Sequence, residues 1–452
     1  MIYTSLEICD PEVDSIIRKE EERQARCLEL IASENFASIS VLQGNSCVLT
    51  NKYSEGQVGC RYYGGTENID EMETLCKERA LKVFNLDPEI WGVNVQVLSG
   101  SNANFAVYLG VMGKTGRIMG LDLPSGGHLT HGYKTKLRKI SASSVFYESC
   151  SYRCRVNEET GYEGIDYDEL EEKAAEFMPD ILICGGSAYP RDFDYARLRK
   201  IAKDRYLMAD ISHISGFVAT GLMKNAFEYA DIVTTTTHKI LRGPRSAMIF
   251  YRKTKVVDGE TIDLQRKIDS AVFPALNGGP HNQKIAALCV ALKQAMTEEY
   301  KKYCKQVIKN TQVLCEEFAN MGFNVFTKGS DCHMLLLSVD GLTGDEMQSV
   351  FDQVDVSINK NCLPTDTRPL KPSAIRIGTP AMTTRGAKEE DFKMIAILME
   401  KTIKTGIRLK NKGEENFIDE IQKSEELKSI KKEVNDFVSQ FPIPCFNFRS
   451  NK

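Results

Sequence analysis

The four threonines at positions 234–237, followed by His238 and Lys239, are the feature that most constrains this chain. β-Branched side chains are stiff and favour strands, so the run predicts a strand end that carries Lys239 out of a sheet. Gly243 and Pro244 follow in a turn that keeps the lysine from reaching solvent freely. A fixed, partly desolvated lysine loses part of its preference for charge, and a neutral amine attacks aldehydes. The pattern predicts a lysine that reacts with an aldehyde such as pyridoxal phosphate; an ordinary exposed lysine is the alternative.

The composition is that of a globular protein with two domains. The 452 residues are 42% hydrophobic and 27% charged, and a net charge of −4 gives no basic footprint for nucleic acid or anionic membranes. The fourteen cysteines are spread out without a CxxC pair, which predicts reduced thiols and neither a disulfide framework nor a metal site. The first residues resemble neither a signal nor a transit peptide, and polar residues interrupt the longest uncharged run, at 90–113. These features predict a cytoplasmic protein.

Short apolar runs alternate with helical patterns between residues 93 and 250, which predicts an α/β domain with a mainly parallel sheet. The expected strands lie at 92–97, 117–120, 140–146, 181–184, 206–210, 232–236 and 247–251. Further helices are expected at 10–32, 70–84, 286–309, 389–412 and 424–438, the last two with solvated outer faces. The predicted division is an N-terminal arm at 1–55, a large domain at 56–292 and a small domain at 293–452.

A phosphate site is one interpretation of Ser99, Gly100 and Ser101, which follow an expected strand and open a helix. Backbone N–H groups and the helix dipole favour an anion at such a position, although an ordinary helix cap has the same sequence. Gly113-Lys114-Thr115 resembles the end of a nucleotide-binding P-loop. That motif needs a glycine at position 108. Tyr108 occupies this position, so the P-loop is excluded.

Asp210 and His213 follow the expected strand at 206–210. A carboxylate at a buried strand end is costly unless it meets a cation, and a protonated pyridine nitrogen would be such a partner. That pairing would keep a pyridine ring charged as an electron sink, and His213 could support the ring oxygen. A metal-binding Asp/His pair and a capping aspartate are the alternatives.

Two further residues are candidates for contacts with a ligand. His128 lies in a glycine-flanked loop and could stack on an aromatic ring; a structural histidine, or a metal pair with His131, is the alternative. Arg376 lies in an apolar, strand-like stretch and needs an anionic partner, which is either a substrate carboxylate or a protein carboxylate.

Seven motifs spread over residues 10 to about 405 resemble the serine hydroxymethyltransferase family, in its eukaryotic type. They are IASEN at 31–35, NKYSEG at 51–56, RYYGG at 61–65, GGHLTHG at 126–132, TTTTHK at 234–239, GGPHN at 278–282 and RIGTPAMTTRG at 376–386. The resemblance implies a fold-type I, pyridoxal-phosphate-dependent transferase of the α/β class. Its large domain would hold a mainly parallel seven-stranded sheet, and its smaller C-terminal domain would be α+β.

The implied activity is the reversible transfer of the hydroxymethyl group of serine to tetrahydrofolate, through an external aldimine of pyridoxal phosphate. The products are glycine and 5,10-methylenetetrahydrofolate. The resemblance also implies a homodimer with shared active sites, a tetramer being a further option, and it requires neither nucleic acid nor a membrane.

Motif positions carry the family's residue roles over to this chain. Lys239 would hold the cofactor covalently, Asp210 would pair with the pyridinium nitrogen and His128 would stack on the ring. The implied catalytic residues are Glu55, Tyr63, His128, Asp210, Thr236 and Lys239. The implied cofactor-binding residues are Tyr53, Ser99, Gly100, Ser101, His128, Ser187, Asp210, His213, His238, Lys239, Gly278 and Gly279.

The resemblance also implies residues for the two substrates. Those for the amino acid are Ser33, Tyr53, Glu55, Tyr63, Arg245 and Arg376, with Arg376 on the carboxylate. Those for folate are Glu55, Leu123, Leu129 and Asn361. The neighbouring subunit would supply Tyr53, Glu55, Tyr63 and the loop with Gly278 and Gly279.

Three other functions remain as alternatives. The first is a threonine-type aldolase that does not use folate. The second is a catalytically silent scaffold or RNA-binding protein that keeps the fold. The third is a metal hydrolase, suggested by the HxxH spacing at 128–131 and the DxxH spacing at 210–213.

Overall fold

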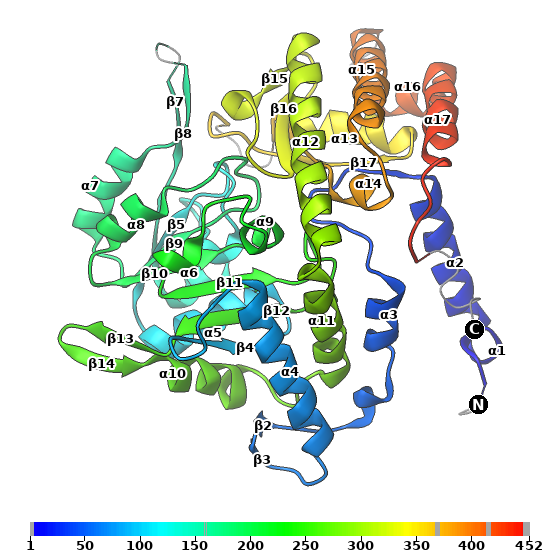
Figure 1. Ribbon diagram of the computed structural model, residues 1–452. Helices are drawn as coiled ribbons and strands as arrows, with labels where there is room; N and C mark the ends of the chain where they lie inside the picture. Colours follow the sequence, from blue (N-terminus) through cyan, green and yellow to red (C-terminus); the bar gives the residue numbers. More distant parts are fainter. Residues whose placement is uncertain (1–3, 158, 160, 367–370, 413–416, 446–452) are drawn as a thin grey trace.

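The computed structural model describes residues 4–157, 159, 161–366, 371–412 and 417–445, and its centre is a seven-stranded sheet (Figure 1). In spatial order the strands are β4 (Trp91–Asn94), β12 (Ala247–Arg252), β11 (Ile232–Thr236), β10 (Tyr206–Asp210), β9 (Ile181–Cys184), β5 (Arg117–Leu121) and β6 (Glu148–Tyr152). β12 is antiparallel to both of its neighbours, and the other pairings are parallel. The predicted α/β class and mainly parallel sheet are confirmed.

One predicted strand is wrong. Residues 140–146 contain helix α6 (Ala142–Phe146), and the edge strand β6 comes directly after it. The apolar side chains of Val145 and Phe146 are exposed, whereas β6 carries polar residues such as Ser149 and Ser151. The apolar run at 140–146 was therefore predicted as a strand in place of β6. An edge strand needs less hydrophobic sequence than a central one.

Successive residues of the central strands enter two different cores. Leu182 and Leu207 lie in one core, and their neighbours Ile183 and Met208 lie in the other, as the period of a strand requires. The first core is covered by α4 (Glu67–Val83), α7 (Tyr167–Phe177), α8 (Tyr195–Ala202), α9 (Ser215–Ala219) and α11 (Asn282–Ala295). The second is covered by α5 (Gly100–Met112) and α10 (Leu264–Ser270), so the sheet is the middle of three layers.

The N-terminal arm crosses to the C-terminal part of the chain. It comprises α1 (Leu6–Cys9), α2 (Pro11–Arg26) and β1 (Leu28–Glu29), followed by α3 (Ile39–Asn45) and the 3₁₀ turn η1 (Val48–Asn51). The helix predicted at 10–32 ends at Arg26. Leu28 and Leu30 are fully buried, and β1 pairs in parallel with β17 (Val356–Ser357), which favours extended backbone there.

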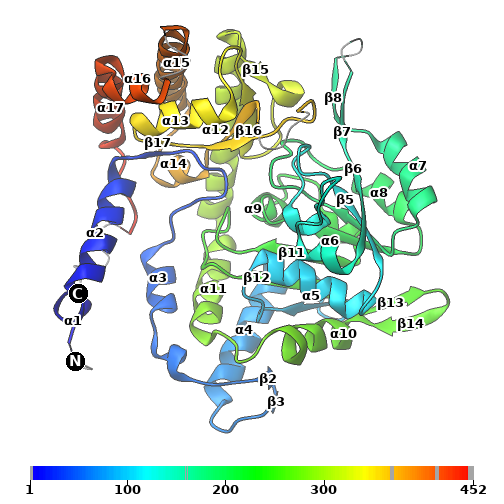
Figure 2. The ribbon, with the colours of Figure 1, turned by 180° about the vertical axis from the view of Figure 1, so that it is seen from behind.

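A second, smaller unit surrounds the sheet β15 (Asn324–Val325), β16 (Met334–Ser338), β19 (Ala374–Gly378) and β18 (Asn359–Asn361) (Figures 1 and 2). Its helices are α13 (Gly344–Gln353), α14 (Pro380–Thr384), α15 (Glu389–Lys412), α16 (Phe417–Lys423) and α17 (Glu425–Val438). The prediction that α15 and α17 have solvated outer faces describes only one side of each helix. Phe392, Met399 and Ile430 are among the residues that their other sides bury in the core of this unit.

Helix α12 (Glu298–Asn320) connects the two units. Tyr300 and Val307 pack in the core of the large sheet, whereas Leu314 and Phe318 pack in the core of the small unit. The single helix predicted at 286–309 is two helices: α11 ends at Ala295, and Thr297 caps α12 by accepting a hydrogen bond from the backbone N–H of Tyr300. The domain boundaries at 55 and 292 stay predictions.

The remaining elements are short. They are the hairpins β2 (Gly56–Gln57)–β3 (Cys60–Arg61), β7 (Cys154–Asn157)–β8 (Tyr162–Ile165) and β13 (Thr254–Val257)–β14 (Glu260–Asp263), and the turns η2 (Leu129–His131), η3 (Ala226–Glu228), η4 (Ala271–Leu276) and η5 (Phe326–Lys328). None of the described helices is both long and apolar enough to cross a membrane.

One arginine fastens the two ends of the chain together. The buried guanidinium of Arg385 donates hydrogen bonds to the backbone carbonyls of Gln24, Ala25, Cys27, Val438 and Phe441. The C-terminal end of α2 and the C-terminal end of α17 therefore share one cation.

Candidate active site

The predicted site residues gather where the parallel strands end. Asp210 is the last residue of β10 and lies opposite Thr234 of β11, whose last residue is Thr236. Lys239 follows three residues later, and Ser99 comes after β4 at the same edge. Ligands of open α/β sheets bind outside the carboxyl ends of the strands. The sheet thus brings together residues that are far apart in the sequence.

Lys239 forms hydrogen bonds through both its side chain and its backbone. Its Nζ donates to Thr236 Oγ1 at 3.0 Å, and its backbone carbonyl accepts from Asn35 Nδ2 at 3.1 Å. Burial lowers the pKa of Lys239 to about 8, although the negative charge of Asp210 acts in the opposite direction. The positive charges of Arg376 and Arg245 contribute to the same lowering. The amine is therefore more often neutral than that of an ordinary lysine.

Asp210 accepts hydrogen bonds on both carboxylate oxygens. Oδ2 accepts from Asn104 Nδ2 at 2.9 Å and lies 3.1 Å from His131 Nε2, while Oδ1 accepts from Ser212 Oγ at 2.6 Å. Burial alone would raise the pKa of Asp210, but the hydrogen bonds from His131 and Ser212 hold it well below its usual range. Sequence reasoning missed Asn104 and Ser212 and did not assign His131 to Asp210. The carboxylate stays ionised in a buried place.

The two histidines of the glycine-flanked loop share the Nε2-protonated tautomer but have different partners. His131 Nδ1 accepts from the backbone N–H of His128 at 3.3 Å, so its Nε2 carries the proton that faces Asp210. His128 Nδ1 accepts from the backbone N–H of Thr130 at 3.2 Å and lies 2.7 Å from its hydroxyl. Burial lowers the pKa of His128 to about 4, so its ring is neutral and can stack on a flat ligand.

His213 pairs with a residue that sequence reasoning missed. Its Nδ1 lies 3.2 Å from Nε2 of His333, and the two rings stack with centroids 5.4 Å apart. Both rings are buried, and burial lowers the pKa of each. His333 precedes β16, so the pair joins the two units at the site. Asp210 bonds to His131 rather than His213, and no described group of three or more His, Cys, Asp or Glu side chains is placed to hold a metal.

Arg376 is a buried cation in β19. Its Nε donates to Asn359 Oδ1 at 3.0 Å, and one Nη donates to the backbone carbonyl of Ser187. Burial lowers its pKa to about 10. Among the described residues no carboxylate lies within ion-pair distance of the guanidinium, although a buried arginine is normally paired. A protein carboxylate, the alternative considered from sequence, does not fill this position within the described chain.

The segment 99–101 opens α5 as predicted. Ser99 is its N-cap, with Oγ accepting from the backbone N–H of Asn102 at 3.4 Å. A Cβ on Gly100 would lie 2.8 Å from Cγ2 of Thr236, so only glycine lets this helix start approach the strand that precedes Lys239. Nearby, Nδ1 of His238 is buried without a hydrogen-bond partner in the described chain.

We expect Gly100→Ala to destabilise the protein by about 1–3 kcal/mol, because the added methyl group must displace Thr236. Urea unfolding measures the change. Gly64→Ala is the matched control, since a Cβ there meets nothing within 4 Å. Equal stability of the two variants would contradict the close approach.

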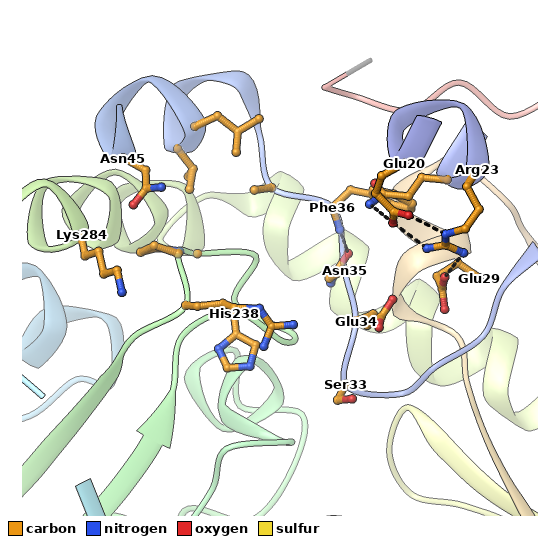
Figure 3. Close-up of a pocket in the computed structure, with 17 residues that line it drawn as sticks. Glu20, Arg23, Glu29, Ser33, Glu34, Asn35, Phe36, Asn45, His238 and Lys284 are labelled. Atoms are coloured by element: carbon orange, nitrogen blue, oxygen red, sulfur yellow. Dashed lines mark hydrogen bonds and ion pairs between the residues drawn. The ribbon is translucent and has the colours of Figure 1, made fainter. Parts of the chain in front are cut away.

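A cavity of about 500 Å³ is lined by the N-terminal arm and by residues next to Lys239 (Figure 3). Ser33, His238 and Arg245 line it, whereas Lys239 does not. The carboxylates of Glu29 and Glu34 lie on one wall, and the basic groups of His238 and Lys284 lie on the other side. Three of the predicted site residues thus border an open space rather than a packed core.

A second group of predicted residues forms a separate, more exposed cluster. Glu55 accepts hydrogen bonds from the hydroxyls of Tyr53 at 3.4 Å and Tyr63 at 3.2 Å, and the two rings lie 5.0 Å apart. A Cβ on Gly278 or Gly279 would lie 3.3 Å from Glu55 or 3.1 Å from Tyr53, so this loop packs directly on the cluster. Tyr53 and Tyr63 remain about half exposed. No hydrogen bond or ion pair within the described chain joins this cluster to Lys239.

Glu55 of this cluster is one of the four residues predicted for folate; the other three, called the rim residues below, are Leu123, Leu129 and Asn361. Leu129 is exposed and starts η2, directly after His128, and Leu123 is half-buried in the preceding turn. Asn361 ends β18, whose first residue Asn359 bonds to Arg376. Two of the three therefore lie next to residues of the buried site.

Comparison with known proteins indicates the family that the sequence motifs resemble. The family model of serine hydroxymethyltransferase matches residues 6–399. The chain belongs to the serine hydroxymethyltransferase family. It is 48% identical to the cytosolic serine hydroxymethyltransferase of Oryctolagus cuniculus over an alignment that covers 98% of this chain and 95% of that protein.

Other relatives are equally similar. The cytosolic serine hydroxymethyltransferase of Saccharomyces cerevisiae is 48% identical, with 98% of this chain and 97% of that protein covered. Serine hydroxymethyltransferase 3, chloroplastic, of Arabidopsis thaliana is also 48% identical, with 96% and 83% covered. Family membership confirms the fold-type I class, and serine hydroxymethyltransferases use pyridoxal phosphate and folate.

Proposed function

We propose that the protein catalyses the reversible transfer of the hydroxymethyl group of serine to tetrahydrofolate, giving glycine and 5,10-methylenetetrahydrofolate. Family membership supports the activity. The observation that carries the assignment to this site is the buried guanidinium of Arg376, which has no carboxylate partner in the described chain and whose charge acts on Lys239. A cation placed beside a reactive amine fits a substrate that carries a carboxylate.

The residues of the site fit pyridoxal phosphate. Bound there, this cofactor supplies an aldehyde for amines and a pyridine ring that takes up electrons. Lys239, which is partly neutral, would hold it covalently, and Asp210 remains ionised to face a protonated ring nitrogen. The neutral ring of His128 would stack on it, and His213 and Ser187 would lie at its ring oxygen. Ser99, Gly100, Ser101 and the unpartnered nitrogen of His238 would bind the phosphate, with Gly278 and Gly279 of a partner subunit.

Substrate binding in this proposal depends on fixed cations. Arg376 is already oriented by Asn359 and the carbonyl of Ser187, so it loses little side-chain freedom when it binds a carboxylate. Thr236 fixes the position of the amine of Lys239 by a hydrogen bond. Ser33 and Arg245 border the adjacent cavity and would contact the amino acid from that side.

Proton transfer is assigned to the exposed cluster. Glu55, bonded to Tyr53 and Tyr63, would hold or release the proton of the serine hydroxyl. A homodimer in which each subunit completes the site of the other gives this cluster a place next to Lys239 of the partner. The three rim residues would bind folate: Leu123, Leu129 and Asn361. We propose the cytoplasm as the location, because two of the relatives are named as cytosolic proteins.

Serine cleavage measured with and without tetrahydrofolate tests the function against the threonine-type aldolase. We expect serine to yield glycine and methylenetetrahydrofolate only when tetrahydrofolate is present. A purified protein that cleaves 3-hydroxy amino acids at the same rate with and without folate would contradict the proposal. A colourless protein without either activity would favour the silent scaffold.

The role of Glu55 is tested by Glu55→Gln, which keeps the shape of the side chain but cannot carry a transferable proton. We expect the folate-dependent cleavage of serine to fall by about 10²-fold or more, because general acid–base catalysis contributes that much. Folate-independent cleavage of bulky 3-hydroxy amino acids should fall far less. Equal losses in both reactions would remove Glu55 from proton transfer.

A further inference from the structure

Two cysteines face each other between helices α4 and α11, away from the residues assigned above. Cys76 of α4 and Cys289 of α11 are both buried, and their sulfurs lie within hydrogen-bonding reach. The two helices pack side by side along their length (Figures 1 and 2). All fourteen cysteines are reduced in the structure, so this is a dithiol.

Arg79 distinguishes Cys289 from the other buried thiols. One Nη of Arg79 donates to Cys289 Sγ at 3.2 Å and to the backbone carbonyl of the same residue at 2.9 Å. The hydrogen bond from Cys76 and the charge of Arg79 lower the pKa of Cys289 to about 7, against the effect of burial. Burial raises the pKa of the other thiols in the cores, namely Cys27, Cys76, Cys154, Cys184, Cys304, Cys315 and Cys332.

We propose that Cys289 and Cys76 form a peroxide-sensitive dithiol, with Cys289 as the attacking thiolate and Cys76 as the resolving thiol. The thiolate of Cys289 attacks one oxygen of a hydroperoxide, the O–O bond breaks, and the sulfur is oxidised to a sulfenic acid while hydroxide or alkoxide leaves. The sulfur of Cys76 then attacks the sulfenic sulfur, forms the S–S bond and releases water. A thiol reductant reverses the change.

The position of Arg79 gives the oxidant a route. Arg79 is only half-buried, and its guanidinium touches the sulfur directly, so Cys289 lies one side chain below the surface. A rotation of Arg79 therefore opens the thiolate without disturbing a core. Small hydroperoxides need no larger opening than that.

The disulfide would join the two helices that directly follow the exposed cluster. Helix α4 follows the loop with Tyr53 and Tyr63, and α11 follows the loop with Gly278 and Gly279. Ser54 and Asn282 already hydrogen bond between these loops at 3.0 Å. Oxidation would thus add a covalent link between two helices whose preceding loops are joined by the Ser54–Asn282 hydrogen bond. This inference does not rest on the proposed function.

The experiment treats the full-length protein with hydrogen peroxide at pH 7, blocks the remaining thiols by alkylation, and maps peptides without reduction. We expect a linked pair of peptides containing Cys76 and Cys289, which dithiothreitol separates. In Cys76→Ala the reaction should stop at the sulfenic acid of Cys289, which dimedone traps. Arg79→Met should slow the reaction by about tenfold at pH 7 because the thiol loses its cation, whereas Arg266→Met, a change at an exposed arginine, should not.

The exposed thiols of Cys9 and Cys60 provide the internal comparison. The proposal is overturned if peroxide oxidises those two while Cys76 and Cys289 in the same sample remain fully alkylated after unfolding. A linked peptide that joins either cysteine to a different partner would overturn it as well. Neither result depends on whether a variant folds, because both are read on the unchanged chain.

Discussion

Replacing Lys239 by alanine is expected to abolish turnover of serine, with a loss of more than about 10³-fold. The variant removes an amine that burial and two neighbouring arginines keep partly neutral, at a pKa of about 8. Roughly a tenth of the unmodified molecules carry a neutral amine there at pH 7, far more than for an ordinary lysine. The visible absorbance that a bound cofactor gives the purified protein should disappear as well.

Borohydride treatment followed by peptide mapping provides a measurement that does not depend on turnover. The unchanged protein should carry the reduced cofactor on the peptide with Lys239, and the variant should carry none. Lys224→Ala, a change at an exposed lysine, is the control and should keep both adduct and activity. An adduct at another lysine, or normal turnover of Lys239→Ala, would remove this residue from its role.

The second large effect is expected for Arg376→Lys, which keeps the charge but loses the planar fork. A lysine cannot bond to Asn359, to the carbonyl of Ser187 and to a substrate carboxylate at the same time. Loss of a buried, hydrogen-bonded charge contact costs about 3 kcal/mol, so kcat/KM for serine should fall by about 10²-fold. Steady-state kinetics and glycine binding measure the change.

The site in Arg376→Lys should still bind the cofactor, because the residues that surround Lys239 and Asp210 are untouched. Its visible absorbance should therefore match that of the unchanged protein. Arg408→Lys, in an exposed ion pair of the same unit, controls for the loss of an arginine elsewhere. An unaltered KM for serine in Arg376→Lys would show that another group binds the carboxylate.

The sequence allowed prediction of the parts that depend on local pattern. β-Branched runs marked central strands such as 232–236, because stiff β-branched side chains favour extended backbone. The predicted lysine, aspartate and serine-rich helix start lie at one edge of the sheet, since parallel strands end on the same side. The edge strand β6 was misplaced because its polar residues lack the pattern.

The partners of the site residues could not be predicted in the same way. Asn104 lies in the middle of α5 and His333 just before β16, and each meets its partner only after the chain has folded. Local sequence says nothing about such long-range pairs. The histidine spacing 128–131 did contain a signal: two histidines three residues apart were considered as a metal pair, and one of them instead orients Asp210.

The hydrogen bonds of Arg385 to both ends of the chain have a consequence for protein production. A truncated protein that lacks the segment around Phe441 would lose some of the carbonyl groups that accept hydrogen bonds from the buried guanidinium of Arg385. A protein that lacks residues 24–27 would lose the others. We therefore expect the protein to tolerate tags and fusions added outside these two segments better than deletions within them.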